Sequence, residues 1–143
     1  MISKKAEYAI NILAELARRE SDKLLSSQDI AGSHDIPITL VAQLVSKLQK
    51  NGLIVSSRGA RGGIRLAVKP ENITLKQVVE IFDGPIGISR CLKSNDYCRK
   101  TSFCPLHQIW KRAQEKMLQE LEQTNILELA QSFASRPEYA ALP

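Results

Sequence analysis

The sequence predicts a mostly α-helical chain with one small β-hairpin, in which a helix-turn-helix is followed by a wing and a long C-terminal helix. Two observations carry this expectation. Apolar residues recur at helical spacing over residues 3–19 and 39–51, and the segment SHDIP turns the chain before the second range. After Gly52, short apolar runs at 53–55 and 64–68 flank the glycine-rich stretch SSRGARGG, which is the pattern of a hairpin.

Each expected helix has a recognisable start or end. Serine and threonine are good N-caps, glycine often lies just past a helix end, and proline fits the first helical position. Thr74 and Gln77 have the spacing of a capping box. The inner face of the first helix is expected to comprise Ala6, Ala9, Ile10, Leu13, Leu16 and Ala17. The expected helices run from Ser3 to about Arg19, from Ser26 or Ser27, from about Thr39 to Asn51, from Thr74 to Gly84, from Pro105 to about Gln123, and onward from Thr124.

The distribution of charge points to an anionic partner. The chain has 143 residues and a net charge of +5. More informative is the interval between Asp35 and Glu71, which contains no acidic residue, because a solvated surface normally mixes both signs. Its cations are Lys47, Lys50, Arg58, Arg61, Arg65 and Lys69.

A one-signed helix-turn-helix with a basic hairpin predicts a winged helix-turn-helix domain that binds duplex DNA. The third helix would lie in the major groove, where Gln43 is either a hydrogen-bonding partner of adenine or a merely solvated glutamine. The hairpin would carry its arginines into the minor groove, while its glycines are read as plain turn residues. The expected DNA-binding residues are Thr39, Leu40, Ala42, Gln43, Lys47, Arg58 and Arg61.

All three cysteines fall in the segment CLKSNDYCRKTSFCPLH, as Cys91, Cys98 and Cys104. An odd number of cysteines cannot pair completely within one chain, so a metal or redox site is expected instead of a disulfide framework. Cys104 precedes a proline and is the expected N-cap of a helix in which His107 is the third residue. The alternatives are small buried cysteines and a solvated His107.

The helix that starts at Pro105 carries an apolar stripe that has to be buried. Either the same helix of a second copy covers it, giving a homodimer, or it packs within one chain. The stripe comprises Leu106, Ile109, Trp110, Ala113, Met117 and Leu121. The expected organisation is a DNA-binding domain over 1–83, a cysteine-rich loop over 84–104, and a dimerisation helix with a final helix over 105–143.

These features together resemble the IscR-type family of bacterial iron–sulfur regulators, which also includes the nitric-oxide sensor NsrR. The resemblance rests on the phrase LVSKLQKNGLIVSSRGARGGIRLAV, the three-cysteine loop and CPLHQIW. It implies a homodimeric transcription factor with Cys91, Cys98, Cys104 and His107 as ligands of a [2Fe–2S] cluster. In [4Fe–4S] members the fourth ligand is a carboxylate from the partner protomer, and Glu7 stands where that residue would. Ala42 replaces an acidic residue with which such proteins discriminate between DNA sites.

The resemblance implies that cluster occupancy orders residues 91–107 and changes the spacing of two recognition helices. Iron–sulfur assembly proteins are a further suggested partner. One alternative is a metal-free regulator that senses oxidation of Cys98 or Cys104, and another is an iron–sulfur carrier or assembly accessory. No secretory segment, membrane span or nucleophile–base pair is recognised, so a cytoplasmic protein without enzymatic activity is expected. His34 is expected to be a solvated turn residue.

Overall fold

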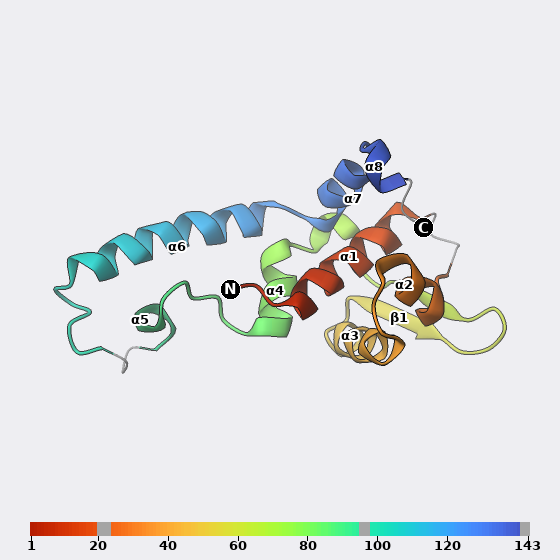
Figure 1. The fold of residues 1–143 in the computed structure, drawn as a ribbon, viewed down its shortest axis with the longest axis horizontal. Helices are drawn as coiled ribbons and strands as arrows, with labels where there is room; N and C mark the ends of the chain where they lie inside the picture. The colour runs from red at the N-terminus through yellow and green to blue at the C-terminus, as the bar shows by residue number, and fades with distance from the viewer. Residues whose placement is uncertain (20–23, 95–97, 141–143) are drawn as a thin grey trace.

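The computed structural model describes residues 1–19, 24–94 and 98–140. A helical head carries a β-hairpin at one end, and the long helix α6 extends from the opposite end (Figure 1). The expected fold class, a mostly helical chain with a winged helix-turn-helix and a long C-terminal helix, is confirmed. None of the helices in the described part of the chain combines the length and hydrophobicity that a membrane span requires.

The observed elements agree closely with the expected ones. The strands pair antiparallel, with Ile54 opposite Leu66 and Ser57 opposite Gly63, and lie one or two residues from their expected positions. The elements are α1 Lys4–Arg18, α2 Ser27–His34, α3 Ile38–Lys50, β1 Ile54–Ser57, β2 Gly63–Leu66, the 3-10 helix η1 Pro70–Asn72, α4 Leu75–Asp83, α5 Arg90–Lys93, α6 Pro105–Gln123, α7 Ile126–Ala134 and α8 Pro137–Ala140.

Helix α1 is the centre of the head. Ser3 caps it, because its hydroxyl accepts a hydrogen bond from the Ala6 amide at 3.2 Å. The fully buried residues of α1 are Ala6, Ala9, Ile12, Leu13 and Ala14, whereas Ile10, which was expected to face inward, is half-buried. Helices α2, α3, α4 and α7 and strand β2 all contact α1. A single apolar core therefore joins the N-terminal elements to the C-terminal helix α7.

The joint between α6 and α7 is hydrogen-bonded to the start of α4. The Leu75 amide donates to the Thr124 carbonyl at 2.9 Å, and the Ile126 amide donates to the Ile73 carbonyl at 2.9 Å. Thr124 was expected to cap α7, but this is wrong: Asn125 is the N-cap and forms a capping box with Glu128. The backbone at Thr124 instead ends α6, so the cap moves one residue along the chain.

Helix α2 has a defined start and a defined end. Ser26 and Asp29 form a capping box at the start of α2. Asp35 ends α2 in the left-handed conformation, with φ of 51°, which aspartate tolerates better than most residues. His34 is the last residue of α2 and pairs with the Glu15 carboxylate of α1, so the expectation of a solvated turn histidine is wrong.

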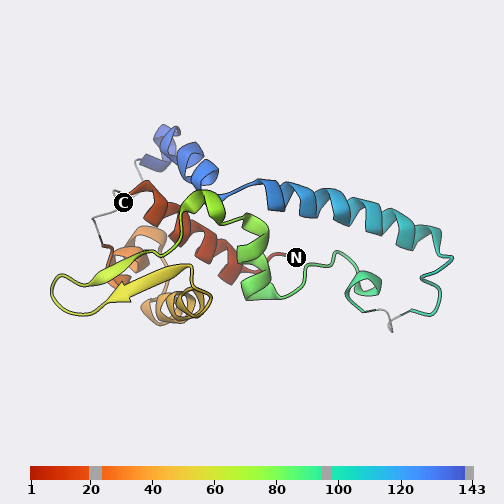
Figure 2. The same cartoon turned by 180° about the vertical axis from the view of Figure 1, so that it is seen from behind.

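Helix α6 stands outside the core. Figure 2 shows α4 between α1 and α6. After α4 the chain extends away from the head beneath α6, and it then turns back to form α6. None of the residues of α6, all of which the structure describes, is buried. Lys76 of α4 pairs with Glu122 of α6 at 2.8 Å, and the Ile88 amide donates to Gln114 Oε1 at 3.0 Å. The expected loop over 84–104 contains the short helix α5, and residues 95–97 of that loop lie outside the described residues.

Glu15 generates a prediction about stability. This residue is only 8% exposed, and its carboxylate pairs with His34 and, at 3.1 Å, with Arg19. Burial on its own raises the pKa of Glu15, but the hydrogen bonds and charges of His34 and Arg19 outweigh it and lower the pKa. Glu15→Gln should reduce the free energy of unfolding by about 1–3 kcal/mol at neutral pH, measured by urea unfolding.

The sign of the pH dependence follows from the lowered pKa. The stabilisation by the Glu15 carboxylate is complete above its unfolded pKa and is lost as the pH falls through the folded pKa. The difference between wild type and Glu15→Gln should therefore shrink on acidification. Glu7→Gln is the matched control, because Glu7 is exposed and pairs with the still more exposed Lys4, and it should change stability by less than about 0.5 kcal/mol. An equal loss in both variants would contradict the prediction.

Candidate nucleic-acid interface and cysteine site

Helix α3 presents a polar surface from its first turn onward. Thr39, Ala42 and Gln43 are exposed, as a base-reading role requires. Leu40, expected on the same surface, is half-buried and packs against the core of the head. Their neighbours Val41 and Leu44 are fully buried, so the orientation of α3 is fixed by apolar packing against α1.

A groove runs between α3, the hairpin and the start of α2. Helix α3 lines it with Ala42, Ser46, Gln49 and Lys50, while β1 and the turn contribute Ser56 and Arg58. No acidic side chain is among the described residues that line it. The sequence predicted Ala42 and Arg58 as DNA-binding residues and placed Lys50 in the acid-free interval, whereas Ser46, Gln49 and Ser56 were not predicted. The signal was available, because residues 42, 46, 49 and 50 share one face of a helix.

Lys47 points elsewhere. Its Nζ lies 5.3 Å from the centre of the Phe82 ring of α4, an arrangement in which the ring face attracts the cation. Lys47 also lines a separate polar hollow with Lys76 and Glu80 of α4. The structure thus separates Lys47 from the groove in which Ala42 lies.

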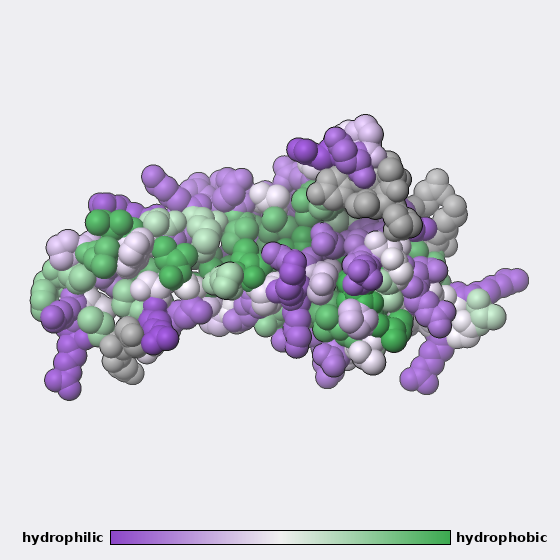
Figure 3. Space-filling view, in the orientation of Figure 1, coloured by the Kyte–Doolittle hydropathy of each residue, from purple (hydrophilic) through white to green (hydrophobic). Residues whose placement is uncertain are grey.

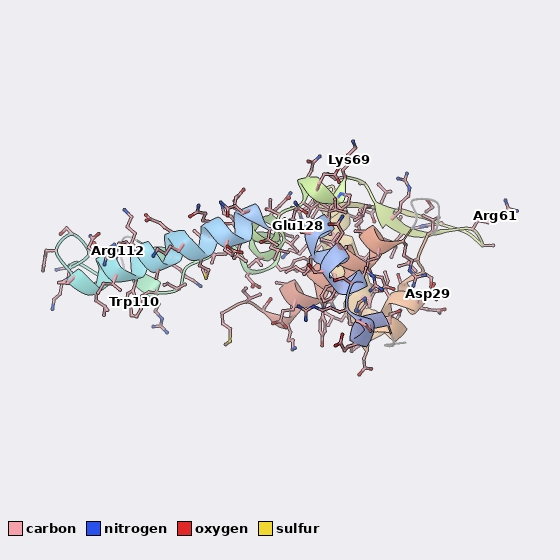
Figure 4. The ribbon with its side chains drawn as sticks, turned by 90° about the horizontal axis from the view of Figure 1, so that it is seen from above. Asp29, Arg61, Lys69, Trp110, Arg112 and Glu128 are labelled. Carbon is pink, nitrogen blue, oxygen red and sulfur yellow. The ribbon has the colours of Figure 1, made fainter. Side chains whose placement is uncertain are left out.

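The hairpin presents its cations at the far end of the head. Arg58 and Arg61 are both exposed, and Figure 4 shows Arg61 at the tip of the hairpin, away from the rest of the chain. The turn requires glycine at position 62, because a Cβ atom there would lie 2.3 Å from the Ser57 carbonyl oxygen. This glycine therefore has a more specific role than that of a plain turn residue.

The cysteine segment brings together one thiol and one imidazole. Cys91 lies on α5, where its Sγ is 3.3 Å from Nδ1 of His107 and 3.3 Å from the Ser89 hydroxyl. His107 is the third residue of α6, and Cys104 is the N-cap of that helix, as the sequence predicted. All three cysteines are half-buried free thiols.

The remaining candidate ligands are not gathered around this pair. Among the described residues, no group of three or more His, Cys, Asp or Glu side chains is arranged to hold a metal ion. Glu7, the alternative fourth ligand, is exposed on α1 and pairs with Lys4 at 3.2 Å. The donor types nevertheless fit an iron–sulfur cluster, because thiolates and imidazole are its ordinary protein ligands.

A helix-turn-helix with a basic wing, a groove beside it whose described lining holds no acidic side chain, and a long helix outside the core define a winged-helix DNA-binding protein. Comparison with known proteins supports this class. Residues 2–132 match the Rrf2 family, described as an iron-dependent transcriptional regulator. The chain belongs to the Rrf2 family of transcriptional regulators.

Individual relatives cover most of the chain. The transcriptional regulator CymR of Bacillus subtilis is 30% identical over 129 residues, which are 90% of this chain and 88% of CymR. The regulator IscR of Aliivibrio salmonicida is 27% identical over 90% of this chain and 76% of IscR. The solved structure of CymR, the global cysteine regulator of B. subtilis, has a TM-score of 0.73 and 28% identity, covering 92% of this chain and 97% of that one.

The hairpin arginines generate a prediction about DNA binding. Replacing both Arg58 and Arg61 by alanine should weaken binding to duplex DNA and reduce the salt dependence by roughly one unit per lost phosphate contact. Fluorescence anisotropy at several salt concentrations measures both effects. Arg136→Ala, at an exposed position between α7 and α8, is the control and should leave the salt dependence unchanged. An unchanged slope in the Arg58→Ala/Arg61→Ala protein would refute a contact between the wing and DNA.

Proposed function

We propose that the protein binds duplex DNA as a homodimer and that Cys91, Cys98, Cys104 and His107 hold an iron–sulfur cluster that controls this binding. The cluster is proposed to be [2Fe–2S], with [4Fe–4S] and Glu7 from the partner protomer as the alternative. The observation that carries the metal assignment is the approach of His107 Nδ1 to Cys91 Sγ at 3.3 Å, in a segment that holds two further free thiols. Family membership alone does not select these four residues.

The DNA contact is assigned to α3 and the wing. The exposed residues Thr39, Ala42 and Gln43 would face the major groove, and Arg58 and Arg61 would reach the adjacent minor groove. The absence of acidic side chains from the described lining of the intervening groove supports this docking, since a carboxylate there would repel phosphate. Lys47 is a weaker candidate because its side chain is directed towards Phe82.

The homodimer is assigned to α6. Leu106, Ile109 and Trp110 are 52%, 48% and 38% exposed, so the described part of the chain leaves this end of the stripe largely uncovered. Figure 3 shows hydrophobic residues extending along α6 from its distal end towards the joint with the head. An apolar surface of this kind is stabilised by burial, and a second α6 related by a two-fold axis offers a matching surface.

The cysteine segment is connected to the head through α4 and to the proposed dimer helix α6. Residues 84–104 link α4 to α6, and α6 is held to α4 by the Lys76–Glu122 ion pair. When bound, an iron–sulfur cluster supplies a redox-active centre whose stability depends on its ligands. Cys98 and Cys104 would have to approach Cys91 and His107 to complete the site. This approach would move the start of α6 relative to α5. A change in the position of α6 would alter the spacing of two recognition helices, which is roughly 34 Å on successive turns of DNA.

A metal-free thiol regulator is the second candidate. A structure described as the oxidised form of Staphylococcus aureus CymR is 28% identical to this chain, with a TM-score of 0.73. In this alternative, oxidation of a cysteine replaces cluster occupancy as the signal. Visible absorption and EPR spectra of protein purified without oxygen distinguish the two, because a thiol regulator has no iron-dependent bands.

The apolar stripe generates a prediction about assembly. Met117→Glu or Ala113→Glu should dissociate the dimer, because each places a charge in the centre of an interface where it has no partner. Light scattering measures the mass. Lys116→Glu, at an exposed position next to the stripe, is the matched control and should leave the dimer intact. A full dimer in both stripe variants would mean that α6 is not the dimer interface.

The fourth ligand generates a prediction about the cluster. Replacing Cys91, Cys98 or Cys104 should abolish a stable cluster, whereas His107→Ala should leave a weakened cluster with a shifted absorption spectrum. Glu7→Ala should change neither spectrum nor iron content, since Glu7 pairs with Lys4 on α1 instead of facing the cysteine segment of its own chain. Absorption spectra and iron analysis after anaerobic purification test both variants. The reverse outcome would exchange the [2Fe–2S] proposal for a [4Fe–4S] cluster bound in part by the partner protomer.

A further inference from the structure

The wing is attached to the head along both of its strands. On the β2 side, Leu25 and Ile64 form a β-bridge, with hydrogen bonds of 3.1 Å from the Leu25 amide and 2.7 Å from the Ile64 amide. On the β1 side, the Ser56 hydroxyl donates a hydrogen bond of 3.0 Å to Gln49 Oε1. The first attachment uses backbone atoms and does not depend on side-chain identity. The second joins the exposed side chains of Gln49 and Ser56, beyond the point at which the buried residue Ile54 anchors β1 in the core.

Gln49 is poorly placed for reading bases. It lies in the last turn of α3, six residues after Gln43. At about 1.5 Å per residue, these positions are separated by roughly 9 Å along the helix axis. The first turns of a recognition helix meet the base edges, whereas Gln49 is turned towards β1, where its carbonyl oxygen is occupied by Ser56.

A small tilt at the base of the hairpin produces a larger displacement of the side chains at its tip. Ser56 is the third residue of β1, and Arg58 and Arg61 lie in the turn beyond it. Each strand residue advances the chain by about 3.3 Å, so a tilt at Ser56 displaces the arginines by more than it displaces the strand. Gly62 makes the turn tight, since a Cβ there would lie 2.3 Å from the Ser57 carbonyl oxygen, whereas a Cβ at Gly63 would meet Leu24 and Leu25 of the head within 3 Å.

We infer that Gln49 is a positioning residue for the wing, which sets the angle between α3 and the hairpin through Ser56. This role rests on the proposed contact of Arg58 and Arg61 with DNA. In this role α3 and the wing bind DNA as one rigid unit, because α3 determines where the arginines meet the minor groove. Loss of the Gln49–Ser56 hydrogen bond would leave both DNA-contacting elements folded but no longer in register with each other.

The test uses two substitutions that differ only in the hydroxyl. Ser56→Thr keeps the donor, whereas Ser56→Val has nearly the same shape without it, and both residues are favoured in strands. Ser56→Val should weaken DNA binding by roughly two- to tenfold, the value of one hydrogen bond, and should lower the salt dependence towards that of Arg58→Ala/Arg61→Ala. Ser56→Thr should bind like wild type. Gln49→Met should match Ser56→Val, and combining the two should add nothing further.

A second experiment distinguishes a positioning role of Ser56 from a direct contact of Ser56 with DNA. It introduces Ser56→Val into the Arg58→Ala/Arg61→Ala protein. In the Arg58→Ala/Arg61→Ala protein, a positioning role leaves Ser56→Val without further effect, whereas a direct contact keeps the full loss. Thermal unfolding by circular dichroism verifies that every variant is folded. Persistence of the loss in the arginine-free background, or wild-type binding by Ser56→Val, would overturn the positioning role.

The failure of the positioning role is distinguishable from that of the proposed wing contact. If Arg58→Ala/Arg61→Ala itself binds with unchanged affinity and salt dependence, the wing does not contact DNA and the role of Gln49 is rejected with it. If the arginine variant loses affinity but Ser56→Val does not, the wing contact stands and only the positioning role is rejected.

Discussion

The apolar packing around α1 is the constraint on which the other elements depend. Ala9, Ile12 and Leu13 are fully buried, and the core that they form includes residues of α2, α3, α4, β2 and α7. Because interiors are close-packed, a shift of α1 would be transmitted to all of these elements. The orientation of α3 is thus determined from its buried side, through Val41, Leu44 and Leu48. Its exposed residues are left free for the proposed contact with DNA.

Electrostatics divides the head into two regions with different roles. The buried carboxylate of Glu15 joins α1 to α2 through His34, close to the turn that precedes α3. The orientation of α3 depends on the geometry of this turn. The pairing of the partly buried Glu15 carboxylate with His34 holds the end of α2 in place, at the cost of desolvating the carboxylate. The groove between α3 and the wing, by contrast, has no acidic side chain among its described lining residues. Negative charge is therefore used within the fold, and the described lining of the groove proposed to face phosphate contains none.

The cysteine segment and the head are mechanically connected without sharing a core. Helix α6 buries none of its residues, yet its C-terminal end is fixed by the hydrogen bonds between residues 73–75 and 124–126 and by the Lys76–Glu122 ion pair. A helix held at one end and exposed along its length can transmit a displacement from its other end, where His107 and Cys91 meet. This arrangement is consistent with control of DNA binding by events at the cysteines, whichever chemistry they carry out. It also places the proposed dimer surface on the same helix as the proposed ligand His107.

The sequence by itself determined the local features of this protein, and tertiary structure decided the pairings between distant residues. Helix ends such as Ser3, Gly52 and Cys104 were predictable because capping depends on neighbouring residues, and the hairpin followed from its glycines. Apolar periodicity likewise gave the inner face of α3. The Glu15–His34 pair and the Gln49–Ser56 hydrogen bond were missed, because only the packing of α2 and β1 against other elements brings these side chains together. The cysteine spacing predicted a site by composition, but Cys91 and His107 meet only because α5 packs on α6. Periodicity and capping are local in the chain, whereas contacts across 16 or 19 residues depend on the three-dimensional path between them.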